Sequence, residues 1–254
     1  MHLLQLPGGS GLGITGFFRS AAILLLTIGA SLAATLAGAV TRSERLPAEI
    51  VKRWGKRFVR IGGWPVRVED AGRIPEGGVI LVANHQSLVD IPLLLSAFPR
   101  EIRFIAKREL GRIPLFGHAM TASGNLFVDR EDPRDAVHMM RQASALLAKG
   151  RALVVFPEGT RSGDGSIGEF RPGAFHIAWK TGFPLVPVYL DGGRRALPKG
   201  SLLFRPAELV VRVLPPVSAG PGRPLSRDGM AEETRRRLLS AKDEEEGRCA
   251  VATS

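Results

Sequence analysis

Residues 79–90 read VILVANHQSLVD, an apolar run that ends abruptly in polar side chains. The run 79–83 follows the pair Gly77-Gly78 and has the length of a buried strand. Asp90 opens a second apolar stretch with Pro92 near its start, which is typical of the first turn of a helix. The stretch therefore predicts a strand, a tight loop and a helix, which is the repeating unit of an α/β fold.

The loop of this unit carries a histidine and an aspartate that are able to contact each other. Only a short segment separates His85 from Asp90, and a single tight turn brings the two side chains together. A carboxylate that accepts one ring N–H fixes the imidazole tautomer and leaves the other nitrogen free to take a proton from a hydroxyl. The alternative is a helix N-cap at Asp90 beside an unrelated loop histidine. These two residues alone leave both interpretations open.

The remainder of the chain alternates strands with helices in the manner of an α/β domain. We predict strands near residues 64–70, 79–83, 103–106, 126–128, 152–156, 185–190 and 208–213, and helices near 90–98, 113–123, 133–149 and 174–181. The expected fold is one domain over residues 64–225, with a central, largely buried mixed sheet flanked by helices. A charged, solvated helix and a tail are expected over residues 226–254.

The first 63 residues are predicted to form a membrane-associated helical region. Residues 1–20 are Gly-rich and expected to be weakly structured, whereas residues 21–40 form an uncharged apolar run. At about 1.5 Å per residue, this run is long enough to span a hydrocarbon core. A secretory signal peptide is the alternative, because Ala37-Gly38-Ala39 resembles a cleavage site. The nearly uncharged amino-terminal segment argues against it.

A basic segment follows the apolar run. Residues 42–60 carry seven basic and two acidic side chains, and apolar residues recur at helical spacing over residues 46–61. This pattern predicts an amphipathic helix on an anionic bilayer, although an ordinary surface helix packed on its own domain shows the same stripe. Basic flanks stay on the cytoplasmic side, so we expect the domain on the cytoplasmic face of the cell inner membrane.

The composition points to an anionic partner. The 254 residues include 35 Lys and Arg against 24 Asp and Glu, for a formal net charge of +11. Nucleic acid fits poorly as the partner, because the cations gather beside the apolar run and no aromatic-rich basic stretch exists. The chain lacks a G-x-S-x-G elbow, a Walker A loop and an H-E-x-x-H motif, which weakens hydrolase, NTPase and metalloprotease functions. A non-catalytic basic membrane-binding or nucleic-acid-binding protein is the non-enzyme alternative.

Two further polar stretches accompany predicted strands, at residues 124–130 and 156–162. Ligands in open α/β sheets gather beyond the carboxyl ends of strands, so these stretches and the 84–90 loop are expected to meet at one site. Arg130 and Arg161 have the forked geometry that suits a phosphate, and Gly159 lets backbone N–H groups approach it. Each arginine, and Glu158, is alternatively a surface ion-pair partner.

Four stretches together carry a resemblance to a known family. They are Asn84-His85-x-x-x-x-Asp90, residues 124–130, Phe-Pro-Glu-Gly-Thr-Arg-Ser at 156–162, and Val186-Pro187-Val188. Their order and spacing resemble the four blocks of the glycerolipid acyltransferases, and the chain closely resembles the bacterial 1-acyl-sn-glycerol-3-phosphate acyltransferases over roughly residues 45–215. The third block looks more like that of the lysophosphatidate enzymes than that of the glycerol-3-phosphate enzymes.

The resemblance implies a reaction and a set of roles. His85 is the general base for the sn-2 hydroxyl of lysophosphatidic acid or a related lysolipid, such as a lyso-ornithine lipid, and Asp90 holds its ring. The oxygen attacks an acyl thioester of acyl-carrier protein or coenzyme A directly, without a metal or bound cofactor. Acceptor contacts are implied for Lys107, Arg130, Thr160 and Arg161 at the phosphate, and for Glu158 and Gly159 at the glycerol.

Overall fold

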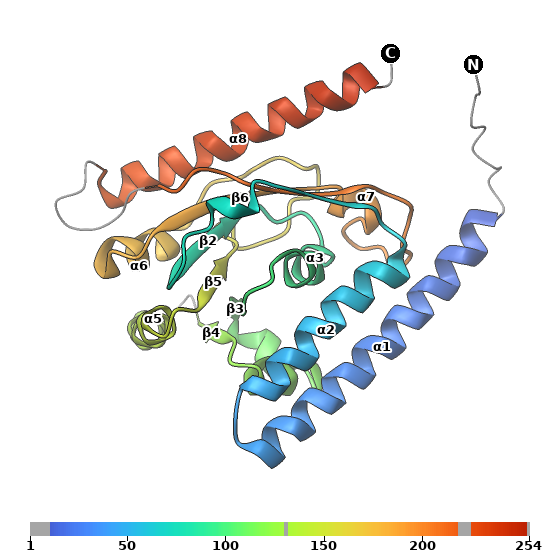
Figure 1. Ribbon diagram of the computed structural model, residues 1–254, viewed down its shortest axis with the longest axis horizontal. Helices are drawn as coiled ribbons and strands as arrows, with labels where there is room; N and C mark the ends of the chain where they lie inside the picture. The colour runs from blue at the N-terminus through green and yellow to red at the C-terminus, as the bar shows by residue number, and fades with distance from the viewer. Residues whose placement is uncertain (1–10, 130–131, 218–224, 253–254) are drawn as a thin grey trace.

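The computed structural model describes residues 11–129, 132–217 and 225–252, and it has a single seven-stranded sheet with helices on both faces (Figure 1). The strands are β1 (Val66–Glu69), β2 (Val79–Ala83), β3 (Ile102–Lys107), β4 (Leu126–Val128), β5 (Ala152–Val155), β6 (Leu185–Asp191) and β7 (Leu209–Val213). The helices are α1 (Gly11–Thr41), α2 (Arg45–Gly62), α3 (Asp90–Ala97), α4 (Phe116–Ala122), α5 (Pro133–Ala148), α6 (Gly173–Thr181), α7 (Gly193–Ala196) and α8 (Arg227–Ala252), with 3₁₀ turns at Ala71–Arg73 and Arg108–Arg112.

The sheet is mixed, as the sequence predicts. Its strand order is β1-β7-β6-β2-β5-β3-β4. Neighbouring strands run parallel except for β6 and β7, which are antiparallel. Strand β2 lies at the centre between β5 and β6, and all five of its residues are buried. A strand that is covered on both faces requires an uninterrupted apolar run, which is the pattern of residues 79–83.

The two faces of the sheet pack against different helices. Val79, Leu81 and Ala83 join a core cluster with residues of α2 and α3, whereas Ile80 and Val82 join one with residues of α5 and α6. This division follows from the alternation of side chains along a strand. Gly55 lets α2 approach α3 closely, because a Cβ there would lie 2.6 Å from the Leu95 Cβ. The result is a three-layered body with β2 in its middle.

Pro187 occupies a position in the central strand β6 where a proline is rarely tolerated. The N–H and C=O groups of one strand residue point to the same side, and the Pro187 carbonyl accepts a hydrogen bond from the Leu214 backbone N–H at 2.9 Å. Its missing N–H therefore faces β7 just beyond Val213, the last residue of the antiparallel ladder. The proline costs the sheet little at this place.

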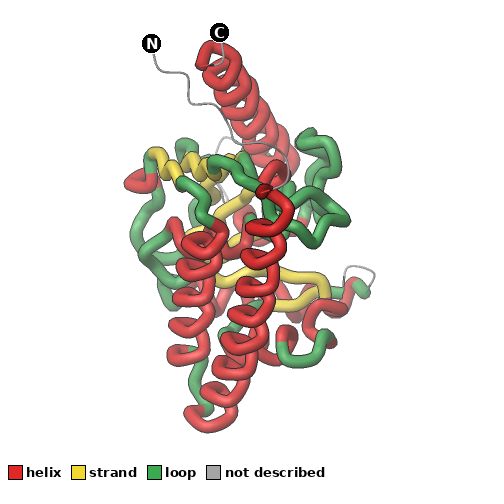
Figure 2. Tube along the Cα trace, turned by 90° about the vertical axis from the view of Figure 1, so that its right-hand side faces the viewer, coloured by secondary structure: helices red, strands yellow, loops and turns green. Residues whose placement is uncertain are grey.

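Helix α1 is longer than the apolar run that predicts it. It begins at Gly11, so residues 11–20 are helical and not weakly structured, while residues 1–10 lie outside the described part of the chain. The span Thr15–Thr41 is long and apolar enough to cross a membrane by length and composition. Figure 2 shows α1 and α2 side by side along the body, and the Trp54 Nε1–H donates to Thr27 Oγ1 across them at 3.0 Å. One face of α1 thus packs on the protein and the other is exposed.

The carboxy-terminal helix α8 is docked and not simply solvated, which corrects the expectation from sequence. Its buried residues follow one helical face: Met230, Thr234, Leu238, Ala241 and Glu245. Arg212 of β7 is itself buried and donates to Glu245 Oε2 at 2.7 Å and to Glu244 Oε2 at 3.1 Å. The ion pairs let a highly charged helix pack on the sheet edge.

Candidate active site

His85 and Asp90 form a direct hydrogen bond at the carboxyl end of β2. The Asp90 Oδ2 atom accepts the His85 Nδ1–H at 2.8 Å and the backbone N–H groups of Gln86 and Ser87 at 2.7 and 2.8 Å. Asp90 is 1% exposed, and three donors on one oxygen offset the cost of burying a carboxylate. With Nδ1–H committed to Asp90, the Nε2 atom of His85 is the free proton acceptor.

This arrangement decides between the two interpretations of the loop. The N-cap of α3 is Val89, and Asp90 is the first helical residue. Asp90 therefore turns back onto His85 and is not a cap beside an unrelated histidine.

The imidazole ring is also packed from one side. Phe156, at the end of β5, stacks on His85 with ring centroids 4.0 Å apart and an interplanar angle of 17°. Asn84 fixes the end of β2 to β6, because its side chain donates to the Leu190 carbonyl at 2.9 Å and accepts the Leu190 N–H at 2.8 Å. The ring thus sits on a rigid support between two neighbouring strands.

Helix α7 closes the space behind Asp90. A Cβ at Gly193 would lie 2.4 Å from Asp90 Oδ1 and 3.2 Å from the Ser87 Cβ. The Ser87 hydroxyl donates to the Leu197 carbonyl at 2.8 Å, just after α7. Only a residue without a side chain fits at Gly193, so this glycine permits the observed position of Asp90.

Glu158 joins the 156–162 loop to the histidine. Its Oε1 atom accepts the His85 backbone N–H at 2.8 Å, and its Oε2 atom accepts the Gly168 N–H at 3.2 Å. The Ser162 N–H donates to the His85 carbonyl at 2.8 Å, so both backbone groups of the histidine are held by this loop. Burial raises the pKa of the Glu158 carboxyl above its ordinary value, although the two N–H donors and His85 oppose the shift.

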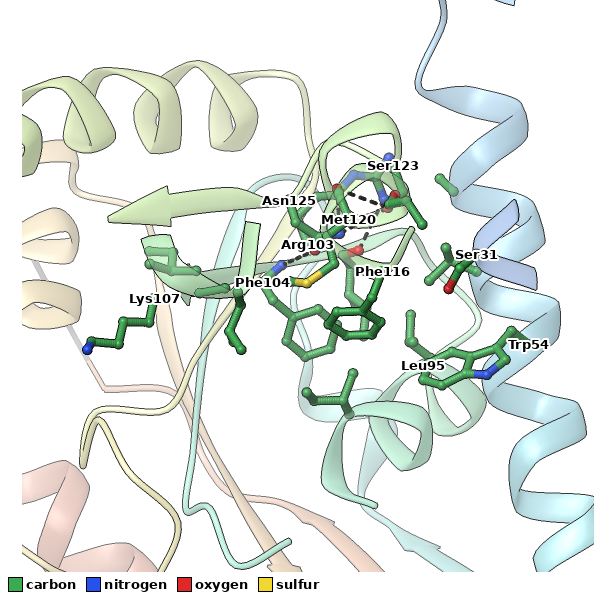
Figure 3. A pocket seen from close by; sticks show the side chains of 18 of the residues that line it. Ser31, Trp54, Leu95, Arg103, Phe104, Lys107, Phe116, Met120, Ser123 and Asn125 are labelled. Carbon is green, nitrogen blue, oxygen red and sulfur yellow. Dashed lines mark hydrogen bonds between the residues drawn. The ribbon is translucent and has the colours of Figure 1, made fainter. Parts of the chain in front are cut away.

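A cavity of about 170 Å³ adjoins His85. His85 and Gly159 are among its lining residues, and α1, α2, α3, β3 and α4 supply most of the others. The side chains around it are mainly apolar, including Trp54, Leu95, Phe104, Phe116 and Met120 (Figure 3). A cavity with such walls suits a hydrocarbon chain, and a chain bound in it would lie next to the histidine.

Comparison with known proteins assigns the chain to a family. A sequence model of the family described as Acyltransferase matches residues 65–191, which is half of the 254 residues. The chain belongs to this acyltransferase family. The match includes β2, the dyad, the 156–162 loop and β6.

Individual members of the acyltransferase family show how far the similarity extends. A 1-acyl-sn-glycerol-3-phosphate acyltransferase of Cocos nucifera is 36% identical over 164 residues, covering 64% of this chain and 53% of that protein. One from Helicobacter pylori is 41% identical over 126 residues, covering 49% of this chain and 53% of that protein. The chain spans about half the length of these relatives.

A solved structure resembles a larger part of the chain. The crystal structure of the 1-acyl-sn-glycerophosphate acyltransferase PlsC from Thermotoga maritima superposes with a TM-score of 0.67 at 30% identity. The superposition covers 88% of this chain and 98% of that one. The likeness therefore extends beyond the family match into the amino-terminal or carboxy-terminal helices.

The cations expected at an acceptor phosphate are only partly brought together within this acyltransferase-family domain. Lys107 lines the cavity at the end of β3 and pairs with Glu109 at 2.8 Å. In the described part of the chain, the half-buried Arg161 side chain has no hydrogen-bond or ion-pair partner, and Thr160 beside it is exposed. Arg130 lies outside the described residues. The 156–162 loop meets the 84–90 loop, but β4 is three strands away from β2.

Three residues of the acyltransferase-family site have no clear signal in the sequence. Phe156 looks like the last residue of a buried strand, and its stacking on His85 depends on β5 lying next to β2. Gly193 opens a short helix that no periodic pattern predicts, and Leu197 directly follows that helix. The Val186-Pro187-Val188 block gives the only hint, since it places β6 beside the site. Across the described ranges, no three metal-ligating side chains gather.

Proposed function

We propose that this protein transfers a fatty acyl group from an acyl thioester to the sn-2 hydroxyl of lysophosphatidic acid, giving phosphatidic acid. The thioester is carried by acyl-carrier protein or coenzyme A. The observation that carries the proposal is the His85–Asp90 hydrogen bond at the mouth of an apolar cavity. The activities for which the relatives and the Thermotoga maritima protein are named support the same reaction.

The proposed step uses His85 as a general base. Its Nε2 atom takes the hydroxyl proton while the oxygen attacks the thioester carbonyl carbon, and Asp90 stabilises the imidazolium that forms. The C–S bond then breaks, and the proton passes from His85 to the leaving thiolate. No acyl-enzyme is needed. Ser87, the hydroxyl closest to His85 in sequence, is buried with its O–H donating to the Leu197 carbonyl, which makes it a poor nucleophile.

The acceptor headgroup in this proposal lies on the 156–162 loop. Arg161 and Thr160 hold the phosphate, with Lys107 and Arg130 as further cationic contacts. Gly159 has a φ of +75°, a conformation that suits glycine, and it lines the cavity next to the site. Glu158 positions the glycerol indirectly, because its carboxyl group braces the backbone of His85.

The membrane is the proposed source of the acceptor. The exposed face of α1 carries Phe17, Phe18, Leu24, Leu25 and Leu36, and the exposed cations of α2 include Arg53, Lys56, Arg57 and Arg60. Ser31 and Ala34 of α1 are buried, and a Cβ at Gly38 would lie 2.7 Å from the Ala122 Cβ of α4. Packing of this face of α1 on the protein favours an α1 that lies within one leaflet. The basic residues after α1 favour the cytoplasmic face of the inner membrane.

The decisive experiment offers the purified protein defined substrates. Lysophosphatidate and a lyso-ornithine lipid are each supplied with an acyl-carrier-protein thioester and a coenzyme A thioester, and thiol release is followed together with the lipid product. We expect phosphatidic acid as the main product. His85→Ala should lower turnover by about three orders of magnitude or more without unfolding the protein, because it removes the proposed proton acceptor. Near-normal turnover of that variant would contradict the role of His85 as the general base.

A further inference from the structure

A loop between α7 and β7, residues 197–206, presents two adjacent leucines to the outside. Leu202 is 86% exposed and Leu203 is 46% exposed. The next residue, Phe204, behaves in the opposite way and packs against the rings of Phe58 and Trp64, with centroids 5.6 and 5.4 Å away. The chain thus partly buries Phe204 and leaves the two leucines before it exposed.

Hydrogen bonds hold this loop in its shape. The Trp64 Nε1–H donates to the Arg205 carbonyl at 2.8 Å, and the Arg205 N–H donates to the Ala196 carbonyl at 2.9 Å. At the tip, the Ser201 N–H donates to the Pro198 carbonyl at 3.0 Å, and the Ser201 hydroxyl accepts the Leu203 N–H at 3.1 Å. The exposure of the leucines is therefore set by a folded backbone.

The 197–206 loop lies against the amino-terminal turns of α1 (Figure 1). The Phe204 N–H donates to the Ser20 hydroxyl at 3.3 Å, and a Cβ at Gly16 would lie 2.9 Å from the Phe204 carbonyl oxygen. Phe17 and Phe18 in these turns are also exposed. The two leucines consequently continue the exposed apolar face of α1 onto the α/β domain.

The charges around the loop match an anionic bilayer. Residues 193–205 contain four basic side chains and no acidic one. Arg194 and Arg205 are exposed, and neither side chain has an ion-pair partner within the described residues. Apolar side chains flanked by cations are the arrangement that binds at the level of anionic lipid headgroups.

We propose that the 197–206 loop is a second membrane contact, with Leu202 and Leu203 inserted into an anionic bilayer beside α1. The inference rests on the proposed membrane-bound function and adds a contact from the α/β domain. Helix α7 and the 197–206 loop that follows it reach the site at three points. A Cβ at Gly193 would lie 2.4 Å from Asp90 Oδ1, the Leu197 carbonyl accepts from the Ser87 hydroxyl, and the Lys199 side chain donates to the Arg161 carbonyl at 3.0 Å. Insertion of the loop therefore sets the depth at which the site meets a lipid hydroxyl.

Site-specific fluorescence tests the contact directly. In the full chain, Cys249→Ser removes the single cysteine, and Leu202→Cys carries a polarity-sensitive fluorophore. Phosphatidylglycerol vesicles should shift its emission to the blue and let lipid-borne quenchers reach it. Leu25→Cys on the exposed face of α1 is the positive control, and the exposed Val137→Cys on α5 is the negative control.

The fluorophores at positions 202 and 25 distinguish a failure of the loop contact from a failure of the proposed membrane binding. A label at position 202 that stays aqueous overturns the inference, and the label at position 25 then tells whether the protein bound the vesicles at all. A blue shift at position 202 that appears without vesicles and grows with protein concentration also overturns it, because a second copy of the chain then covers the leucines.

Kinetics give a second readout. The variant Leu202→Ser/Leu203→Ser should raise the apparent KM for vesicle-embedded lysophosphatidate by about tenfold, because two inserted leucines are lost. Turnover of a short-chain, monodisperse acceptor should stay unchanged, since that substrate needs no membrane. Val137→Ser is the matched control for both substrates. An unchanged KM on vesicles contradicts the proposal, as does an equal loss on both substrates.

Discussion

Gly193 sets the space available to the Asp90 carboxylate, and this makes a conservative substitution informative. Gly193→Ala places a methyl group 2.4 Å from Asp90 Oδ1, so the carboxylate must move. We expect kcat to fall by roughly 10–100-fold with a smaller change in KM, because a small misplacement of a catalytic group has this order of effect.

The control for this prediction is Gly72→Ala, where an added Cβ would meet nothing within 4 Å. Steady-state kinetics and thermal unfolding are measured on both variants. A Gly193→Ala protein that is folded and keeps full kcat would show that the position of Asp90 is not critical.

The pKa of Glu158 predicts a pH dependence of stability. Burial raises this pKa in the folded state, so the folded protein holds a proton that the unfolded chain has already released at slightly acidic pH. The free energy of unfolding should therefore decline as pH rises from the ordinary glutamate pKa through the raised one. Glu158→Gln should remove this decline. The free energy of unfolding is measured by denaturant titration at pH 5 and pH 7 for both proteins. An equal change with pH in the two proteins would show that Glu158 does not cause the decline.

Spacing along the chain explains which site residues the sequence reveals. His85 and Asp90 are close neighbours, so one turn is enough to predict their contact. Phe156 and Gly193 reach the same place from distant segments, and their contacts exist only because β5 and β6 flank β2. A single sequence carries no signal for that adjacency.

At the scale of elements, α8 depends on charge pairs that are largely removed from water. Arg212→Ala leaves the buried Glu245 with one of its guanidinium partners gone. We expect a loss of about 3 kcal/mol in the free energy of unfolding, the usual cost of breaking a buried pair. Denaturant titration measures it, and the exposed pair at Arg236 provides the control. Arg236→Ala should cost below about 1 kcal/mol, and equal losses in the two variants would contradict the buried network.

Two elements depart from the sequence prediction for identifiable reasons. Gly11, Gly13 and Gly16 disguise the start of α1, because glycine is a poor helix former, yet packing of Gly16 against Phe204 requires so small a residue. In α8 the apolar residues are separated by many Arg and Glu side chains, so the face that docks through ion pairs looks solvated in the sequence. Tertiary contacts override local composition in both helices.

At the scale of the whole molecule, the formal charge of +11 predicts salt-sensitive membrane binding. Binding to phosphatidylglycerol vesicles should weaken as salt rises, because counterions screen exposed charges over about 8 Å at physiological ionic strength. Some binding should persist at high salt, since the apolar face of α1 does not depend on charge. Vesicle flotation at several salt concentrations checks this, with neutral phosphatidylcholine vesicles as the control. An affinity for vesicles that changes with neither salt concentration nor lipid charge would contradict this prediction.

The fold class can be predicted from the sequence, but the order of the strands in the sheet cannot. Alternating strands and helices predict an α/β domain with a central sheet, and the structure confirms that fold class. The insertion of β7 between β1 and β6 has no sequence signal, because pairing order depends on long-range packing. The same packing decides that β4 lies three strands away from β2 in the sheet.

The pairing of β1 with β7 has a consequence for how the chain is made. Val66 lies opposite Leu209, so β1 cannot pair until β7 has been synthesised, about 140 residues later. At about 5–20 residues per second on the ribosome, that delay lasts on the order of 7–30 s. The α1–α2 hairpin has left the ribosome long before then. In the proposed membrane-bound protein, α1 and α2 are therefore able to attach to lipid before the sheet is complete.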